Sequence, residues 1–180
     1  GKLRFNRTTQ GVYEMGSTFK IFTTAMAFEA GTATMRSGYD ATNPIRIARF
    51  TIRDFRAKNR WLSVPEIFLY SSNIGSVKMA LDVGIKKHRR FLSQLGMLEP
   101  VGIELLETGA PLSPARWREI NSMTISYGHG LAVTPLHLVA GVSAIVNGGI
   151  YRSPSLLRHE LGEPAVGKRI ISEETSKNMR

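Results

Sequence analysis

Ser17 and Lys20 are the residues of this sequence whose types and spacing most directly suggest chemistry. A separation of three on a helix places both side chains on one face about a turn apart, so the lysine amine can reach the serine hydroxyl. Ser17 also lies at the expected start of that helix, where unpaired backbone N–H groups favour a developing oxyanion. These are the requirements of a nucleophilic serine.

The S-x-x-K pattern is not specific by itself, because a serine that caps a helix, followed by a lysine on the surface, has the same sequence pattern. The residues after Lys20 carry no charge until Glu29, and Phe19, Phe22 and Met26 fall at helical spacing. A helix over residues 17–30 with so few charges is expected to be buried. Lys20 is therefore expected inside the protein.

Ser71 and Asn73 form the second candidate pair, at the expected end of one helix and start of the next. A hydroxyl can pass a proton, and an amide can both donate and accept hydrogen bonds. The same S-x-N pattern recurs at 176–178, and both copies could be helix caps. We favour the first copy because Leu69 and Ile74 would hold it against a core, whereas the second lies on a polar helix.

The four histidines are expected to be structural. His88 and His137 lie on apolar helical stripes, His159 lies in a polar loop, and His129 stands between two glycines in a permissive turn. The spacing of these histidines fits no metal-binding motif, and no phosphate-binding glycine loop occurs, so we expect neither a metal nor a cofactor. The absence of cysteine excludes disulfides and thiolate catalysis.

Helix signals dominate the rest of the chain, and strand signals are sparse. A capping box at Ser63 opens a short helix that runs to about Tyr70. Ser113-Pro114 and Thr134-Pro135 each place a capping hydroxyl before a proline, which predicts two more helix starts. Further helices are expected over residues 74–82, 85–95 and 172–180, and short strands over 45–52 and 168–171.

The net charge of +10 is unevenly distributed. One stretch, residues 46–60, contains six basic residues and a single acid, Asp54, and residues 86–90 contain four more cations. Neither cluster carries the interleaved aromatic residues or the motifs of a nucleic-acid-binding domain, so we expect no nucleic acid partner. A solvated basic face, close to anionic lipid or an acidic polymer, is the simpler interpretation.

Four blocks of this sequence, in order and spacing, resemble class B penicillin-binding proteins, and most closely the septal, division-specific peptidoglycan transpeptidases. The blocks are Asn6-Arg7-Thr8, Tyr13 to Lys20, Leu69 to Gly75, and Ser126 to Leu131 followed by Val133-Thr134-Pro135-Leu136. Met15 stands where the family usually has proline. The resemblance implies an α+β, β-lactamase/transpeptidase-like fold, of which residues 1–180 supply mainly the helical part with few strands.

The resemblance also implies roles for the candidate residues. Ser17 would attack the D-Ala-D-Ala carbonyl of a stem peptide, with its own backbone N–H as an oxyanion donor, and β-lactams would mimic that substrate. Lys20 would take the Ser17 proton, and Ser71 would relay it to the leaving amine. Asn73 would orient the lysine and bind the substrate amide. The alternatives are a β-lactam-sensing or β-lactam-hydrolysing relative, and a non-catalytic scaffold that docks partners.

The family's third landmark, Lys-Thr-Gly, does not occur in these 180 residues. We therefore expect residues 1–180 to be a partial transpeptidase domain that lacks flanking sheet strands at both ends. An unperturbed lysine, with a pKa of ~10.4, is neutral in only about one molecule in 2,500 at pH 7. Without the Lys-Thr-Gly strand, part of the environment that lowers this pKa would be missing, so the isolated piece should be acylated poorly.

For the full-length protein the resemblance implies a location at the periplasmic face of the inner membrane, with an anchor that this chain does not contain. It also implies division membrane proteins and a glycosyltransferase as partners.

Overall fold

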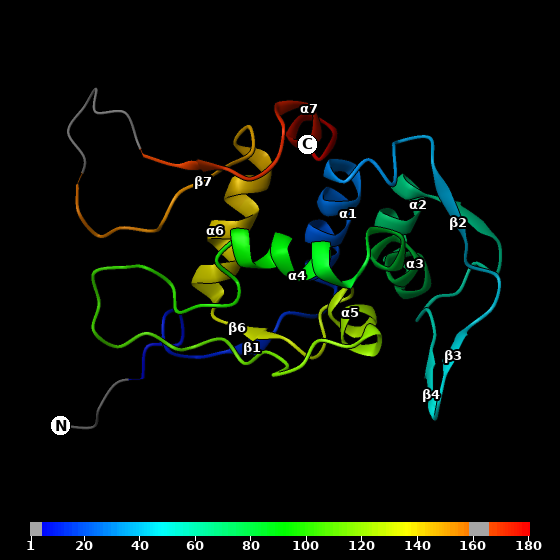
Figure 1. The fold of residues 1–180 in the computed structure, drawn as a ribbon, viewed down its shortest axis with the longest axis horizontal. Helices are drawn as coiled ribbons and strands as arrows, with labels where there is room; N and C mark the ends of the chain where they lie inside the picture. The colour runs from blue at the N-terminus through cyan, green and yellow to red at the C-terminus, as the bar shows by residue number, and fades with distance from the viewer. Residues whose placement is uncertain (1–4, 159–165) are drawn as a thin grey trace.

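The computed structural model describes residues 5–158 and 166–180, and the helices of this part surround one buried helix, α1 (Figure 1). The helices are η1 (Gly16–Phe19, a 3-10 turn), α1 (Lys20–Glu29), α2 (Val64–Leu69), α3 (Asn73–Val83), α4 (Ile85–Gln94), α5 (Glu119–Ile125), α6 (Pro135–Val146) and α7 (Glu173–Asn178). The strands are β1 (Tyr13–Glu14), β2 (Gly38–Asp40), β3 (Ile45–Ile47), β4 (Phe50–Ile52), β5 (Trp61–Ser63), β6 (Ala132–Val133), β7 (Ile150–Tyr151) and β8 (Lys168–Arg169).

Helix α1 forms the centre of the core. Phe19, Phe22 and Met26 are buried, and the rings of Phe19 and Phe22 meet edge to face with centroids 5.2 Å apart. Helix α1 contacts α2, α3, α6 and α7, so residues far apart in the sequence lie around it. Burial of each such side chain stabilises the fold by roughly 1.5–3 kcal/mol, which keeps the position of α1 fixed.

Side-chain caps set where several helices begin, as the sequence predicts. Ser63 and Glu66 form the predicted capping box at α2, and Thr134 caps α6 immediately before Pro135. The predicted helix at the C-terminal end is also present as α7, with Ser172 as its cap. These local signals place the helix starts correctly because each cap satisfies a backbone N–H that has no partner within the helix.

The strands of the described residues form four separate antiparallel pairs, β1–β6, β2–β5, β3–β4 and β7–β8. The pair β1–β6, with Tyr13 opposite Val133 and Glu14 opposite Ala132, joins the segment before Ser17 to the segment after α5. The pairs β2–β5 and β3–β4 form a projection beside α2 and α3 (Figure 1). No helix in this part of the structure is both long and apolar enough to cross a bilayer.

Two predictions from the sequence differ from the structure. The helix predicted to start at Ser113-Pro114 is absent, and α5 begins only at Glu119. Trp117 of the intervening segment packs edge to face on His88, which an extended approach to α5 allows. The predicted strand over residues 45–52 is instead a hairpin of β3 and β4, with Ala48 in the left-handed backbone region at φ 48°.

Candidate active site

Lys20 joins the two candidate pairs into one centre. It is the first residue of α1, its side chain is 3% exposed, and its Nζ lies 2.8 Å from the Ser17 Oγ and 3.0 Å from the Ser71 Oγ. Ser17, on the η1 turn just before it, is exposed, and Ser71 is half-buried. The structure therefore places a buried amine between two hydroxyls, that of Ser17 three residues away in the chain and that of Ser71 51 residues away, and Ser17 is the more exposed of the two.

Burial lowers the pKa of Lys20 to about 8, and the carboxylate of Asp54 opposes this shift. A lysine with that pKa is neutral in about one molecule in ten at pH 7, compared with about one in 2,500 for an unperturbed lysine. Burial among the described residues thus increases the fraction of Lys20 in the neutral form, which is the form that can accept a proton.

The turn between α2 and α3 positions Ser71. Its backbone is left-handed, with φ 55°, a conformation that residues other than glycine and asparagine rarely adopt. Ser72, the next residue, caps α3 by accepting a hydrogen bond from the Gly75 N–H at 2.9 Å. Asp54 holds this turn from outside, because its carboxylate accepts hydrogen bonds from the Ser72 hydroxyl at 2.7 Å and the Ile74 N–H at 2.9 Å.

Asn73 is the first residue of α3, so it lies next to the centre in the chain. Its amide Nδ2 donates a hydrogen bond of 2.9 Å to the carbonyl oxygen of Arg53. Among the described residues it makes no hydrogen bond to Lys20. The predicted contact with the lysine is therefore not formed here, and the role of Asn73 toward a substrate stays a prediction.

Glu14, on β1 three residues before Ser17, makes contacts that the sequence analysis did not single out. Its carboxylate accepts a hydrogen bond from the Gly130 N–H at 2.7 Å and lies 3.0 Å from the Nδ1 of His129. The bond with His129 lowers the pKa of Glu14. The Gly16 N–H donates to the Gly128 carbonyl at 3.1 Å, and a side chain at Gly128, whose φ is +91°, would overlap the backbone of Gly16.

These contacts fix the backbone immediately before Ser17 by tying it to the loop after α5. The glycines on both sides of His129 are visible in the sequence as a turn signal, but nothing local predicts that Glu14 reaches them over more than 110 residues. Asp54 was visible only as the single acid in a basic stretch. Both residues escape prediction because their hydrogen-bond partners are distant in the chain.

The remaining candidate residues do not belong to the centre. His88 is buried with its Nδ1 2.6 Å from the Ser122 hydroxyl, and burial lowers its pKa to about 4. His137 completes the capping box of α6, and its Nε2 lies 2.8 Å from the Glu99 carbonyl oxygen. Ser176, of the second S-x-N copy, lies on α7 and accepts a hydrogen bond from the N–H of Gly148, just after α6. His159 lies outside the described residues.

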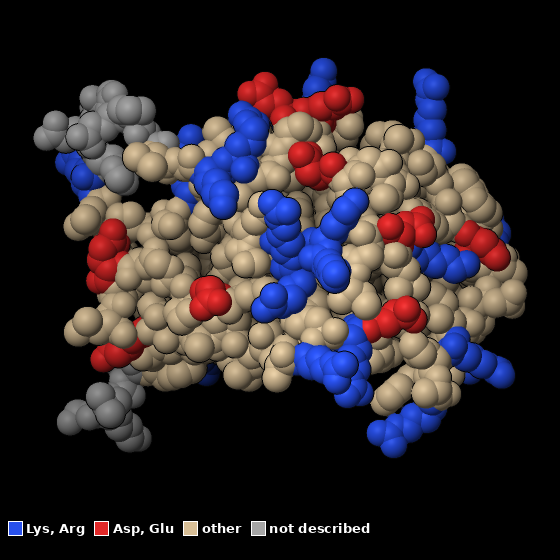
Figure 2. Space-filling model, viewed as in Figure 1, with Lys and Arg blue, Asp and Glu red and all other residues tan. Residues whose placement is uncertain are grey.

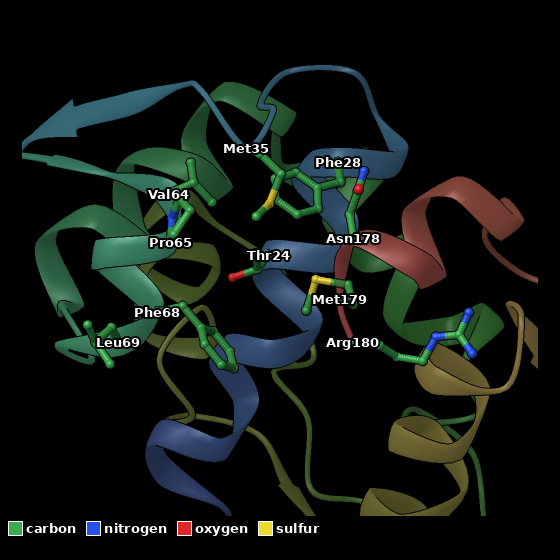
Figure 3. Close-up of a pocket in the computed structure, with 10 residues that line it drawn as sticks. All are labelled: Thr24, Phe28, Met35, Val64, Pro65, Phe68, Leu69, Asn178, Met179 and Arg180. Atoms are coloured by element: carbon green, nitrogen blue, oxygen red, sulfur yellow. The ribbon is translucent and has the colours of Figure 1, made fainter.

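An apolar groove of about 480 Å³ lies apart from this centre (Figure 3). Thr24 and Phe28 of α1 line it, facing Val64, Pro65 and Phe68 of α2, and the side chain of Met179 reaches its middle. Its lining includes none of Ser17, Lys20, Ser71 and Asn73. The candidate groups therefore lie outside this groove.

Two groups of basic residues on the surface contain four exposed cations each. Figure 2 shows Lys and Arg gathered over α4, where Lys86, Lys87, Arg89 and Arg90 are exposed. The other group lies on residues 53–60, the connection from β4 to β5, which we call the basic loop. Its cations Arg53, Arg56, Lys58 and Arg60 are exposed, and it packs against the turn that carries Ser71.

Comparison with known proteins places this geometry in context. Residues 3–180 match the family described as penicillin binding protein transpeptidase domain. The chain is 38% identical over 176 residues to the probable peptidoglycan D,D-transpeptidase FtsI of Caulobacter vibrioides, covering 98% of this chain and 30% of that protein. It is 32% identical over 170 residues to the peptidoglycan D,D-transpeptidase FtsI of Escherichia coli strain K12, covering 93% of this chain and 28% of that protein.

Solved structures show the same fold. A structure described as a peptidoglycan glycosyltransferase from Burkholderia ambifaria superposes with a TM-score of 0.92 at 24% identity, covering 99% of this chain and 57% of that one. The apo transpeptidase domain of Burkholderia pseudomallei penicillin-binding protein 3 gives 0.90 at 26% identity, covering 97% and 53%. These superpositions confirm the predicted α+β, transpeptidase-like fold. The chain spans under a third of the curated relatives it matches.

Proposed function

This chain belongs to the penicillin-binding protein transpeptidase domain family, and on that premise we propose that it carries the acylation centre of a serine D,D-transpeptidase that cross-links peptidoglycan stem peptides. The observation that supports this most is the position of Lys20 Nζ between the Ser17 and Ser71 hydroxyls, at 2.8 and 3.0 Å. A nucleophile, a base and a proton relay within hydrogen-bond reach of one another are what acyl transfer requires.

In the first half of the reaction, the Ser17 Oγ attacks the carbonyl carbon of the penultimate D-Ala as Lys20 takes the hydroxyl proton. The tetrahedral intermediate then breaks the C–N bond to the terminal D-Ala. The proton passes from Lys20 through Ser71 to the leaving nitrogen, so the amine departs neutral. The products are free D-Ala and an ester between the peptide and Ser17.

In the second half, the amine of a neighbouring peptide attacks this ester. Its proton moves to Lys20 and then to the Ser17 oxygen as the C–O bond breaks, which restores the serine and forms the cross-link. A β-lactam would acylate Ser17 in the same way, but its leaving nitrogen stays tethered in the opened ring. That tether obstructs the approach of the acceptor amine and traps the ester.

Two further groups would bind the substrate in this proposal. The backbone N–H of Ser17, at the start of η1, would donate to the oxyanion. The Asn73 amide, held by the Arg53 carbonyl through its Nδ2, would bind the substrate amide with the remaining donor and acceptor capacity and would contact Lys20 once a substrate is bound.

We further propose that residues 1–180 are part of a transpeptidase domain completed by strands elsewhere in a longer protein, one of which carries Lys-Thr-Gly. The coverage of 57% and 53% of the two solved chains supports this. The longer protein would be anchored in the inner membrane with this domain in the periplasm, and would work with division membrane proteins and a glycosyltransferase. Without the second cation and oxyanion donor of that strand, these 180 residues alone would be acylated slowly.

Labelled penicillin with intact-mass detection tests the proposal. In the longer protein we expect one label per molecule, none with Ser17→Ala, and a strongly reduced rate with Ser71→Ala. Ser176→Ala, which alters the serine of the second S-x-N copy, is the matched control and should be acylated normally. Labelling of the Ser17→Ala variant would contradict the proposal, and rapid stoichiometric labelling of the isolated 180 residues would contradict the predicted impairment.

The fate of the acyl-enzyme separates the transpeptidase from its alternatives. A transpeptidase should lose its penicilloyl group only slowly to water, whereas a β-lactam-hydrolysing relative would turn it over. A non-catalytic scaffold would support cell division equally well with Ser17→Ala in the full-length protein, whereas an enzyme would not.

A further inference from the structure

The basic loop, residues 53–60, lies against the turn that carries Ser71. The Arg53 carbonyl accepts from Asn73 Nδ2 at 2.9 Å, and Asp54 caps the same turn through Ser72. Lys58 Nζ lies 4.5 Å from the ring centroid of Tyr70, the residue before Ser71. The loop is thus tied to the reactive turn at three of its residues.

The positive charge of the loop is larger than the carboxylates around it can neutralise. Glu66 is already occupied, because it pairs with Arg60 at 2.7 Å and caps α2 through Ser63, and these bonds hold its pKa at about 2. The carboxylate of Asp54 is bound by the turn. Arg53, Arg56 and Lys58 form no ion pair with any residue that the structure describes.

The loop also offers an apolar contact. Phe55, between Asp54 and Arg56, is 95% exposed. A loop with an aromatic ring in solvent and three cations that form no ion pair is typical of a surface that binds an extended anionic ligand, since the ring packs on the chain of the ligand while the cations meet its charges. By contrast, the exposed cations of α4 lie on the outer face of a helix whose apolar residues are buried, which is what a solvated basic face looks like.

We propose that the basic loop is a specificity subsite that binds a free carboxylate of the stem peptide outside the scissile bond. This inference rests on the proposed transpeptidase function and names the chemistry that its substrate must carry. The loop contacts Tyr70, Ser72 and Asn73, the residues on either side of Ser71, and its cations are not part of the Ser17, Lys20 and Ser71 hydrogen bonds. They would strengthen binding of the peptide and leave the chemical step unchanged.

Equilibrium binding to the full-length protein with Ser17→Ala tests this, because that variant forms no acyl-enzyme. The probes are two labelled peptides ending in D-Ala-D-Ala, one with a free carboxylate upstream of that end and one with the carboxylate amidated. Fluorescence anisotropy should show about tenfold tighter binding of the carboxylate peptide, since each exposed pair contributes about two- to fivefold. Replacing Arg53, Arg56 and Lys58 together by Gln should abolish this preference.

The matched control replaces Lys86, Lys87 and Arg89 of α4 by Gln, which removes the same charge and should keep the preference. A preference that survives in the loop variant, or equal binding of both peptides to the parent, would overturn the inference. If the triple variant is unfolded by circular dichroism, the single change Lys58→Gln should reduce the preference two- to fivefold, and an unchanged preference would count equally against it. Failure of the transpeptidase proposal itself would appear separately, as penicillin labelling of Ser17→Ala.

Discussion

Lys20 and His88 are both basic side chains buried in the helical part of the molecule, and burial lowers the pKa of both. Their exposed fractions are almost equal, at 3% and 2%. What differs is the hydroxyl each one meets. His88 meets Ser122, which is fully buried between α4 and α5, whereas Lys20 meets Ser17, which is exposed.

The comparison shows that a lowered pKa does not by itself define a reactive centre. A neutral base is useful only if it contacts a nucleophile that a substrate can reach. His88 stabilises a helix pair, and its lowered pKa is a by-product of that packing. For Lys20 we propose the opposite relation, in which the fold tolerates a buried amine because the chemistry needs it.

The largest expected effect comes from Lys20→Met in the longer protein, which keeps the volume and removes the base. Acylation by penicillin should fall about 10²–10⁴-fold, the usual contribution of a general base. Stability should rise at the same time, because the pKa shift from 10.4 to about 8 corresponds to about 3 kcal/mol spent on burying the amine at neutral pH.

The pH dependence of unfolding tests whether Lys20→Met stabilises the protein for this reason. The unfolded lysine keeps its proton up to its ordinary pKa, so wild-type stability rises as the pH increases from about 8 to 10.4. Urea unfolding should therefore show the Met variant more stable at pH 6 and nearly equal at pH 10.5. A variant that is less stable at both pH values would break the comparison, because Lys20 would then be a stabilising residue.

The pH dependence of acylation gives the second effect. Only neutral Lys20 can take the Ser17 proton, so the second-order rate with penicillin should rise about tenfold per pH unit below a pKa of about 8 and level off above it. In the longer protein a second cation would move the plateau to lower pH. Stopped-flow acylation between pH 5 and 9 measures this, and a flat profile that extends to the lowest pH would exclude Lys20 as the titrating base.

His88→Asn tests the structural half of the comparison. Asn can keep the hydrogen bond to Ser122 but does not titrate. In the wild type, the unfolded chain takes up a proton at His88 near pH 6.5 and the folded chain only near 4, so stability falls by up to about 3 kcal/mol over this range. Urea unfolding at pH 7 and 4 should show a smaller loss in the variant, and acylation should be unchanged. Equal losses would contradict a neutral, buried His88.

Glu14→Gln gives the smallest effect and extends the comparison to an exposed pair. The Glu14 and His129 side chains are 48% and 57% exposed, so the pair should contribute below about 1 kcal/mol at pH 7. Because the pKa of Glu14 is lowered, this contribution is present above pH 4.5 and is lost as the pH falls through the folded pKa. Glu173→Gln, which alters a more exposed pair with Arg169, is the control and should change stability less.

Local signals in the sequence predicted much of the helical scaffold. The caps at Ser63, Thr134 and Ser172 each bind a partner three residues away, so the local sequence is enough to predict where these helices begin. The same logic failed at Ser113-Pro114, because a cap and a proline permit a helix without requiring one. In the structure Trp117 of this segment packs on His88, a contact that is not local and that the sequence around Ser113 does not reveal.

The candidate centre divides in the same way. The Ser17 and Lys20 contact follows from helical spacing, whereas the contact of Lys20 with Ser71 spans 51 residues and was reached only through the resemblance of several blocks to a family. The two S-x-N copies show why: one serine faces a buried amine and the other receives a backbone N–H of a loop. Nothing within the three letters distinguishes these surroundings.

The left-handed backbone of Ser71 has a consequence for how this protein would respond to selection. Glycine adopts such a conformation at little cost, so exchanging Ser71 for glycine would relax the turn and, in the mechanism that we propose, remove the proton relay in a single step. A library screened only for heat resistance should therefore enrich glycine at this position, and one screened for survival of dividing cells should retain serine. If the two screens select different residues, serine at position 71 lowers the thermal stability of the protein and is retained for its function.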